Sequence, residues 1–574
     1  MTLPDLLQYC LFMVIVIACV RPVGMYLFRV FNGQKTLLDS ALCPVERFIY
    51  HAAGIDPQSE MDWKQYTLAF IVFGVFGTVL LFVILLLQRW LPWFDPAYQN
   101  TPMTADLALN TAISFSTTTT WQAYGGETTM SYFSQMVGLT AQNFLAGAAG
   151  LAVGIAFIRG LARQQTEKLG NFWADLTRAV LWVLLPLSVA GGLILVWQGV
   201  PMNFSPYTKI TTVEGVTQII AQGPVATLET IKNLGTNGGG FFNVNAAHPY
   251  ENPTPLTNLL ELLMIAVLPA SLTYTFGRME KKPRQGWTIF WVMTLLFVAG
   301  LIVAGWAEQS GNPHIAALGV DMQASDFQPG GNMEGKELRF GVHGSVPAAV
   351  TTSNGATGSY NSMHDSYTPV GGMVPLVNML LGELIYGGLG SGLYSMVMLV
   401  LVSVFVGGLM VGHTPQYLGK QVTIPETKLI ASYIVVGMAT ALPLTCIAVA
   451  TAAGRGGLVT NQGAHGLTTI LFAYVSSLAN NGQNFAGLNA NSVFYNVTTA
   501  MAMLVGRFGL AAIALALAGC FAEQGLRPAS LGTLLTDTPT FATLLTATIL
   551  ILAGLSYLPA LTLGPIIEHL RMIA

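Results

Sequence analysis

The chain has 574 residues, of which 53% are hydrophobic and only 9% charged, and its formal net charge is −3. An ordinary soluble domain contains about 25% charged residues, so this sequence has too little polar surface to cover a globule and predicts an integral membrane protein. Its basic residues form no run, which excludes electrostatic capture of nucleic acid, and its five cysteines have neither disulfide nor zinc spacing.

Ten apolar stretches are long enough, or nearly so, to cross a bilayer core of about 30 Å as helices. Lys and Arg concentrate in alternate loops, which the positive-inside rule assigns to the cytoplasm. Because the number of spans is even, both termini are expected on the extracytoplasmic face. The stretches lie near residues 6–28, 67–88, 133–158, 179–198, 256–276, 287–306, 373–411, 429–453, 493–521 and 540–566.

The loops assigned to the outer face are rich in acidic residues. Such residues would raise the local cation concentration at a mouth, but ordinary solvated loops explain them equally well. They are Asp95, Glu127, Glu214, Glu229, Glu251, Glu308, Asp321, Asp326, Glu334, Glu337 and Asp365.

Four short segments on the assigned outer face, residues 104–117, 224–235, 345–352 and 465–477, are each too short to cross a membrane. Each runs into Thr, Asn, Ser and Gly, so we expect re-entrant helices. The residues that follow them recur at intervals of 118, 120 and 124, which predicts a fourfold repeat. The anchors of this repeat are Thr119, Asn237, Thr357 and Asn481.

The expected organisation is a single membrane domain, 1–574. An extra N-terminal span (1–60) precedes four span, pore-helix and span repeats at 61–170, 171–285, 286–424 and 425–530. An extra C-terminal span (531–574) follows them. The predicted fold class is therefore an all-α membrane protein with a pseudo-fourfold, potassium-channel-like arrangement.

The four loops after the short segments carry no charge and read STTTTWQ (116–122), GTNGGGFF (235–242), TTSNGATGS (351–359) and SSLANNGQN (476–484). A dehydrated cation needs an oxygen shell, which rings of backbone carbonyls provide without a fixed charge that would trap it. Glycine permits the required backbone angles, and the negative ends of the short helices would favour a cation. One such loop alone is equally consistent with a helix contact or a turn; four at regular spacing indicate a filter.

The apolar stretch 373–411 would be about 58 Å long as a straight helix, so it must break. We expect the break in the run GGLGSG, at Gly387, Gly388, Gly390 and Gly392, and hypothesise a gate there. Glu383 in the same span is either part of an ion route or a salt-bridge partner for Arg507.

No ATP-binding or aspartyl-phosphate motif is present, and His343, His364 and His413 are not spaced as metal ligands.

Several long strings resemble the KdpA family, the potassium-binding subunits of the Kdp potassium-transporting ATPase. They are WQAYGGETTMSYFSQM (121–136), LGTNGGGFFN (234–243), NMEGKELRFG (332–341) and MHDS (363–366), and the likeness runs from RPVG (21–24) to LPALTLGP (558–565). The resemblance implies a fold related to potassium channels and to Trk and Ktr transporters. It also implies a bacterial inner-membrane complex with a KdpB-like P-type ATPase subunit that uses ATP and Mg²⁺, a KdpC-like single-span subunit and a KdpF-like small peptide.

Carried over by position, the resemblance assigns a potassium filter to these loops. In the third repeat, Asn354 and Gly355 compete with the assigned pair, and His413 stands where the family has Arg. The assigned residues are Thr118, Thr119, Thr120, Gln122, Asn237, Gly238, Gly239, Thr357, Gly358, Asn480, Asn481 and Gly482.

The expected function is capture of extracytoplasmic potassium for an ATP-driven uptake pump. The chain itself would have no catalytic residue, cofactor or transition metal, and potassium would be the substrate. The alternative is a stand-alone Trk- or Ktr-like potassium channel or symporter, which would carry ions without partners.

Overall fold

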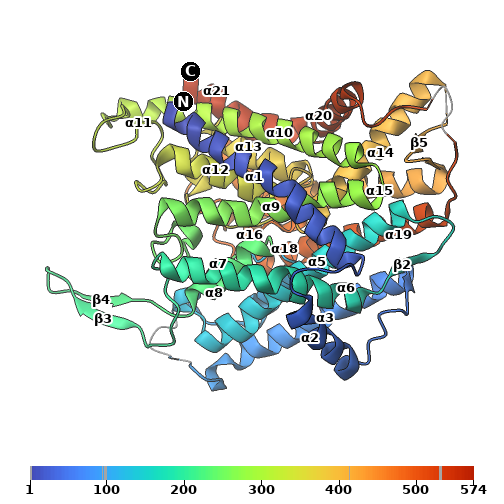
Figure 1. Cartoon of the computed structure of the whole chain (residues 1–574). Coiled ribbons are helices and arrows are strands. Elements are labelled where there is room, and N and C mark those ends of the chain that lie inside the picture. The colour runs from blue at the N-terminus through green and yellow to red at the C-terminus, as the bar shows by residue number, and fades with distance from the viewer. Residues whose placement is uncertain (1–2, 94, 96–99, 413, 529–532) are drawn as a thin grey trace.

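The computed structural model describes residues 3–93, 95, 100–412, 414–528 and 533–574. Within this part of the chain, ten helical segments are long and apolar enough to cross a membrane (Figure 1), which is the number expected from the sequence. They are Leu6–Phe31, Trp63–Trp90, Ser134–Ala162, Phe172–Trp197, Pro255–Met279, Pro283–Ala317, Ser391–Met410, Ile424–Ala450, Val493–Glu523 and Pro539–Ile573.

Several spans are assembled from more than one helical element. Four π-helical segments, at Ser134–Thr140, Ala179–Leu184, Val505–Gly509 and Thr562–Ile566, interrupt the regular winding. The α-helices of the spans are α1 (Leu3–Phe31), α3 (Trp63–Leu87), α5 (Ala141–Ala162), α6 (Phe172–Arg178), α7 (Leu185–Trp197), α9 (Pro255–Met279), α10 (Pro283–Ser310), α14 (Ser391–Val411), α15 (Ile424–Ala450), α18 (Val493–Leu504), α19 (Leu510–Glu523), α20 (Pro539–Leu561) and α21 (Ile567–Ile573).

Four short helices lie where re-entrant helices were expected. They are α4 (Ala105–Ser116), α8 (Val225–Leu234), α12 (Gly341–Asn354) and α17 (Gly463–Ala479). The third and fourth are longer than the predicted segments because each starts earlier and ends two residues later. Gly341 and Gly463 adopt positive φ angles of 61° and 67° at the helix starts.

The sequence did not predict the small elements outside the spans. These are the helices α2 (Asp39–Ala53), α11 (Pro313–Ala317) and α16 (Ala452–Arg455), and three two-stranded antiparallel sheets. The sheets pair β1 (Met61–Asp62) with β2 (Lys168–Gly170), β3 (Thr208–Thr211) with β4 (Thr217–Ile220), and β5 (Gln416–Tyr417) with β6 (Lys420–Gln421). The β3–β4 hairpin projects from one end of the molecule (Figure 1).

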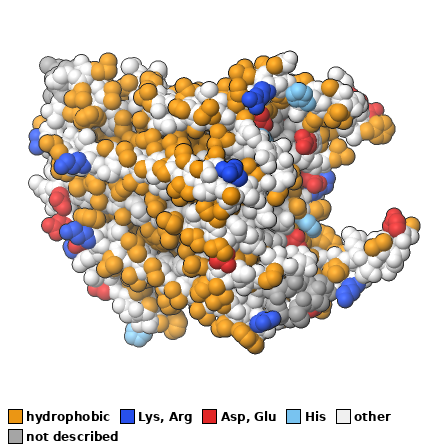
Figure 2. Space-filling view, turned by 180° about the vertical axis from the view of Figure 1, so that it is seen from behind, with side chains coloured by type: hydrophobic (Ala, Val, Ile, Leu, Met, Phe, Trp, Pro, Cys, Tyr) orange, Lys and Arg blue, Asp and Glu red, His pale blue; other side chains and the backbone are white. Residues whose placement is uncertain are grey.

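The spans differ sharply in how deeply they are buried. Of the 18 most apolar consecutive residues of each span, 83% are buried inside the protein in Ser134–Ala162, but only 11% in Pro539–Ile573. Figure 2 shows hydrophobic side chains spread over the middle of the molecule, while charged side chains gather toward its two ends. This distribution is that of a protein whose flank is covered by lipid.

Both chain ends lie at the same end of the long helices as the β3–β4 hairpin (Figure 1). An even number of spans requires this, so the geometry agrees with the expected common side for the termini.

The long apolar stretch 373–411 does break. Helix α13 (Pro369–Leu380) ends, residues 381–390 are non-helical, and α14 begins at Ser391. The interruption includes the predicted Gly387, Gly388 and Gly390, but it starts earlier, and Gly392 already belongs to α14.

Candidate functional site

The short helices α4, α8, α12 and α17 all end at the predicted loops. The backbone N–H groups of Asn237, Thr357 and Asn481 each donate to a carbonyl five residues back, at 2.9, 3.2 and 2.9 Å. In the first loop, the Thr120 N–H donates to the Ser114 carbonyl at 2.9 Å. The negative helix ends therefore adjoin the loops, which favours a cation there.

The four loops share a backbone pattern. Each predicted anchor directly follows a residue with a left-handed φ: Thr118 (64°), Thr236 (49°), Ala356 (52°) and Asn480 (58°). A further positive φ comes at Thr120, Gly239, Gly358 and Gly482, shortly after the anchor. Alternation of φ sign turns successive carbonyls toward one side of the chain, and such strained non-glycine residues cluster at functional sites.

The loops also meet one another. A Cβ added to Gly238 would lie 2.7 Å from the Thr357 carbonyl oxygen and 3.2 Å from the Asn481 carbonyl oxygen. A Cβ on Gly358 would collide with the Asn481 carbonyl, and one on Gly482 with the Thr119 carbonyl. Carbonyl oxygens from three loops therefore face glycines of neighbouring loops at contact distance.

Side-chain hydrogen bonds brace the loops from behind. The Asn480 amide donates to Thr119 Oγ1 at 2.9 Å, joining the fourth loop to the first. The Asn237 amide donates to the Asn143 carbonyl at 2.9 Å. Gln122 spans from the first loop to the second, because its Oε1 accepts the Gly240 N–H at 2.8 Å.

In the third repeat, the structure brings Gly358 and not Gly355 against the other loops. Asn354 is the last residue of α12, with its amide donating to the Val350 carbonyl at 2.9 Å. A Cβ on Gly355 would meet Ile265, which lies behind the loop.

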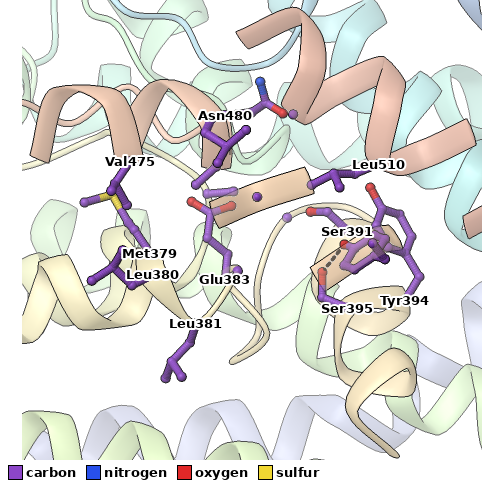
Figure 3. Close-up of a pocket in the computed structure, with 18 of the residues that line it drawn as sticks. Met379, Leu380, Leu381, Glu383, Ser391, Tyr394, Ser395, Val475, Asn480 and Leu510 are labelled. Carbon is purple, nitrogen blue, oxygen red and sulfur yellow. Dashed lines mark hydrogen bonds between the residues drawn. The ribbon is translucent and has the colours of Figure 1, made fainter. Parts of the chain in front are cut away.

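The loops separate two cavities. On the hairpin side lies a cavity of about 630 Å³ whose lining includes Gln122, Tyr360 and Asn484. On the other side lies one of about 140 Å³, lined by residues of all four loops (Thr118, Thr236, Ala356 and Asn480) together with Glu383 and Tyr394 (Figure 3). An ion that passed between the two cavities would have to cross the ring of loops.

A buried histidine lines the larger cavity, on the hairpin side, without adding positive charge. His364 is 2% exposed, and its Nδ1 lies 3.2 Å from Gln483 Oε1. Burial lowers the pKa of His364 to about 3, so the ring is neutral at physiological pH. Of the two other histidines singled out in the sequence, His343 belongs to the described residues and His413 lies outside them.

The interrupted segment, residues 381–390, lines the smaller cavity and contacts the loops. Its Leu389 N–H donates to Thr236 Oγ1 at 3.1 Å, and its Gly388 N–H donates to the Gly355 carbonyl at 3.2 Å. Figure 3 shows Glu383 extending into the cavity toward the loops, opposite Ser391 and Ser395 of α14.

Of the two alternatives for Glu383, the salt bridge to Arg507 is wrong, since these two described residues have other partners. Glu383 Oε1 instead accepts from the Asn481 amide at 2.7 Å, and Arg507 donates to the Ala146 carbonyl at 2.8 Å. Both side chains line the same cavity, but their hydrogen bonds go to different elements, and the buried Nε of Arg507 has no hydrogen-bond partner. The carboxylate is thus tied directly to a filter-candidate asparagine.

The acidic residues assigned to the outer loops are not all solvated. Glu229, Glu251 and Glu308 are fully buried. Glu229 pairs with Lys232 and Glu308 with Lys336, each at 2.6 Å, while Glu251 accepts the Phe241 N–H at 2.7 Å. These three carboxylates hold the structure together rather than attract cations at a surface.

The fold and the ring of loops define a multi-pass membrane protein with a potassium-channel-like pore-loop fold. In agreement, the crystal structure of the potassium transporter TrkH from Vibrio parahaemolyticus matches with a TM-score of 0.51 and 12% identity, covering 89% of this chain and 97% of that one. The sequence also matches the family described as potassium-transporting ATPase A subunit, KdpA, over residues 10–570. The chain belongs to this family.

Relatives match at full length. A protein of Methylorubrum extorquens is 52% identical, covering 99% of this chain and 98% of the relative. One of Rhodospirillum centenum is 50% identical, covering 100% and 99%. Each is named potassium-transporting ATPase potassium-binding subunit.

Proposed function

We propose that this chain binds extracytoplasmic potassium in the ring of four loops and delivers it to an ATP-driven uptake pump, of which it is the non-catalytic, potassium-binding subunit. Family membership and the names of the full-length relatives support the assignment to this pump. The observation that carries the ion-binding role is the approach of the Thr357 and Asn481 carbonyls to Gly238, between two cavities.

The proposed filter comprises the residues assigned from the sequence, with Thr357 and Gly358 for the third loop. Potassium would lose its water at the larger, hairpin-side cavity, bind among backbone carbonyls and threonine or asparagine oxygens, and leave into the smaller cavity. Glu383 and the glycines of the interrupted segment would then form the exit route. ATP hydrolysis would come from a KdpB-like subunit, with KdpC-like and KdpF-like subunits completing the complex.

The proposed function also requires one orientation in the membrane. The larger cavity, the β3–β4 hairpin and both termini would face the extracytoplasmic side of the bacterial inner membrane, as the distribution of Lys and Arg along the sequence predicts. The TrkH likeness concerns the fold alone and does not favour a stand-alone channel or symporter.

Partner dependence tests the proposal against the stand-alone alternative. The purified chain and the co-expressed complex are reconstituted separately in vesicles, and uptake of radioactive potassium is measured with and without ATP enclosed in the vesicles. A pump subunit predicts uptake only by the complex and only with ATP. Comparable ATP-independent uptake by the chain alone would refute it in favour of a channel or symporter.

A further inference from the structure

A fully buried lysine lies behind the second loop. Lys232 belongs to α8, its side chain has no exposed surface, and its Nζ lies 2.6 Å from Glu229 Oε2 and 2.7 Å from Asn245 Oδ1. An ammonium group out of water is strongly unfavourable unless it is paired and hydrogen-bonded. Its position between these two side chains is therefore closely constrained.

Asn245 connects Lys232 to the second loop by hydrogen bonds to both. Lysine can only donate, so the Asn245 carbonyl oxygen must face it, and the Asn245 NH₂ group must face the other way. There it donates to the Gly239 carbonyl at 2.7 Å. Asn245 has a left-handed φ of 56°, a conformation that its surroundings must hold in place.

Both polar groups of the peptide between Gly239 and Gly240 thus have a hydrogen-bond partner. Its carbonyl accepts from Asn245, and its N–H donates to Gln122 Oε1 of the first loop at 2.8 Å. Gly239 has a φ of 76° and no side chain, so little else opposes rotation of this peptide.

The neighbouring peptides are held by a second carboxylate. Glu251 Oε1 accepts the N–H groups of Phe241 at 2.7 Å and Phe242 at 3.2 Å. The outer end of the second loop thus rests on a buried cluster of ionisable side chains, in which Lys232 lies among Glu229, Glu251 and Glu261 and forms its ion pair with Glu229.

We propose that Lys232 is a positioning residue for cation selectivity, acting through Asn245 to hold the Gly239 carbonyl in one direction at the outer end of the filter. The inference rests on the proposed potassium filter. Discrimination between cations depends on the number and direction of the oxygens offered to the ion. Without the Lys232–Asn245 link, the Gly239 peptide rotates and the ring distinguishes potassium from rubidium less well.

The test measures ATPase stimulation of the co-expressed complex by potassium and by rubidium, and compares the two half-stimulating concentrations as a ratio. Lys232→Met removes the charge. Asn245→Asp keeps the shape and the contact with Lys232 but replaces the donor to Gly239 by an acceptor. We expect the ratio to move toward one by about twofold to tenfold in both variants, the equilibrium factor for one hydrogen bond.

Lys420→Met is the matched control. Lys420 is also buried, and its Nζ donates to the carbonyls of Gly160 and Leu161, far from the loops in the β5–β6 region. Loss of this lysine should leave the rubidium-to-potassium ratio unchanged even where total activity falls. A change in ratio as large as that of Asn245→Asp would show general loosening and overturn the proposal.

Gly238→Asp separates this inference from the proposed function. If Gly238→Asp raises the potassium requirement while Asn245→Asp keeps the wild-type ratio, the filter stands and the role of Lys232 is refuted. If Gly238→Asp has no effect, the filter itself fails. Should Lys232→Met not assemble into the complex, the isosteric Asn245→Asp decides the outcome alone.

Discussion

At the scale of single residues, the site depends on backbone strain held in place by burial. Thr118, Thr120 and Asn480 adopt left-handed φ angles, each costing about 1–3 kcal/mol, and all three are nearly or fully buried. The hydrogen bond from Asn480 to Thr119 ties two of these loops together. The strain orients the loop carbonyls and is stable only because four loops support one another.

The link between Glu383 and Asn481 leads to a prediction about stability. Glu383→Ala leaves one Asn481 N–H without its acceptor in a buried site, which should cost about 1–3 kcal/mol. Glu383→Gln retains a carbonyl oxygen of similar position and should cost less. Thermal unfolding of the purified chain at constant potassium compares the two variants; equal losses would contradict a hydrogen-bonding role for this carboxylate.

Residue composition and spacing predicted where the loops lie, but not which side chains form hydrogen bonds with them. The anchors Thr119, Asn237, Thr357 and Asn481 were identified because short apolar segments and polar loops recur at nearly constant spacing. The partner of Glu383 was not, since Asn481 lies 98 residues away and only packing brings them together. The burial of Glu229 and Glu251 was missed for the same reason.

At the scale of elements, the C-terminal helix is attached to the fourth short helix by one histidine. His465, near the start of α17, has Nε2 2.9 Å from Asp365 Oδ1 and Nδ1 2.7 Å from Glu568 Oε1 of α21. Burial alone would lower the pKa of His465, but its hydrogen bonds and charge interactions with Asp365 and Glu568 outweigh burial and raise the pKa to about 9. The charged imidazole thus joins three elements.

This attachment predicts a pH dependence. Because the folded-state pKa is raised from 6.5, the contribution of His465 to stability is complete below about pH 6.5 and disappears as pH rises through about 9. His465→Gln should therefore cost about 1–3 kcal/mol at pH 6 and little at pH 10. Thermal unfolding across this range measures the difference; an equal cost at both ends would rule out a charge-dependent attachment.

The elements themselves were largely predictable. The ten spans follow from runs of apolar residues, and the break in 373–411 follows from its excess length. The amphipathic α2 and the β3–β4 hairpin were missed because they lie outside the membrane spans, where the apolar-run criterion says nothing. The starts of α12 and α17 were placed late because their first turns are rich in glycine and polar residues.

At the scale of the whole molecule, the proposed orientation can be tested with two exposed positions at opposite ends. Val213 in the β3–β4 turn and Leu37 before α2 are 102% and 98% exposed. In intact cells, Val213→Cys should react with a membrane-impermeant maleimide, whereas Leu37→Cys should react only after permeabilisation. The chain with only its native cysteines measures the background labelling. The reverse labelling pattern would show that the orientation is opposite to the one proposed.

In the proposed function, the four loops form the potassium site that controls ATP hydrolysis in the complex. The most direct test is potassium-stimulated ATPase activity of wild type and Gly238→Asp, with Gly554→Ala as a control glycine that has open space around it. A Cβ at Gly238 would lie 2.7 Å from the Thr357 carbonyl, and the added carboxylate would intrude on the ring. We predict a rise of about tenfold or more in the half-stimulating potassium concentration for Gly238→Asp, equivalent to at least about 1.4 kcal/mol, and none for Gly554→Ala. An unchanged response in Gly238→Asp would place the ion path elsewhere and contradict the proposed filter.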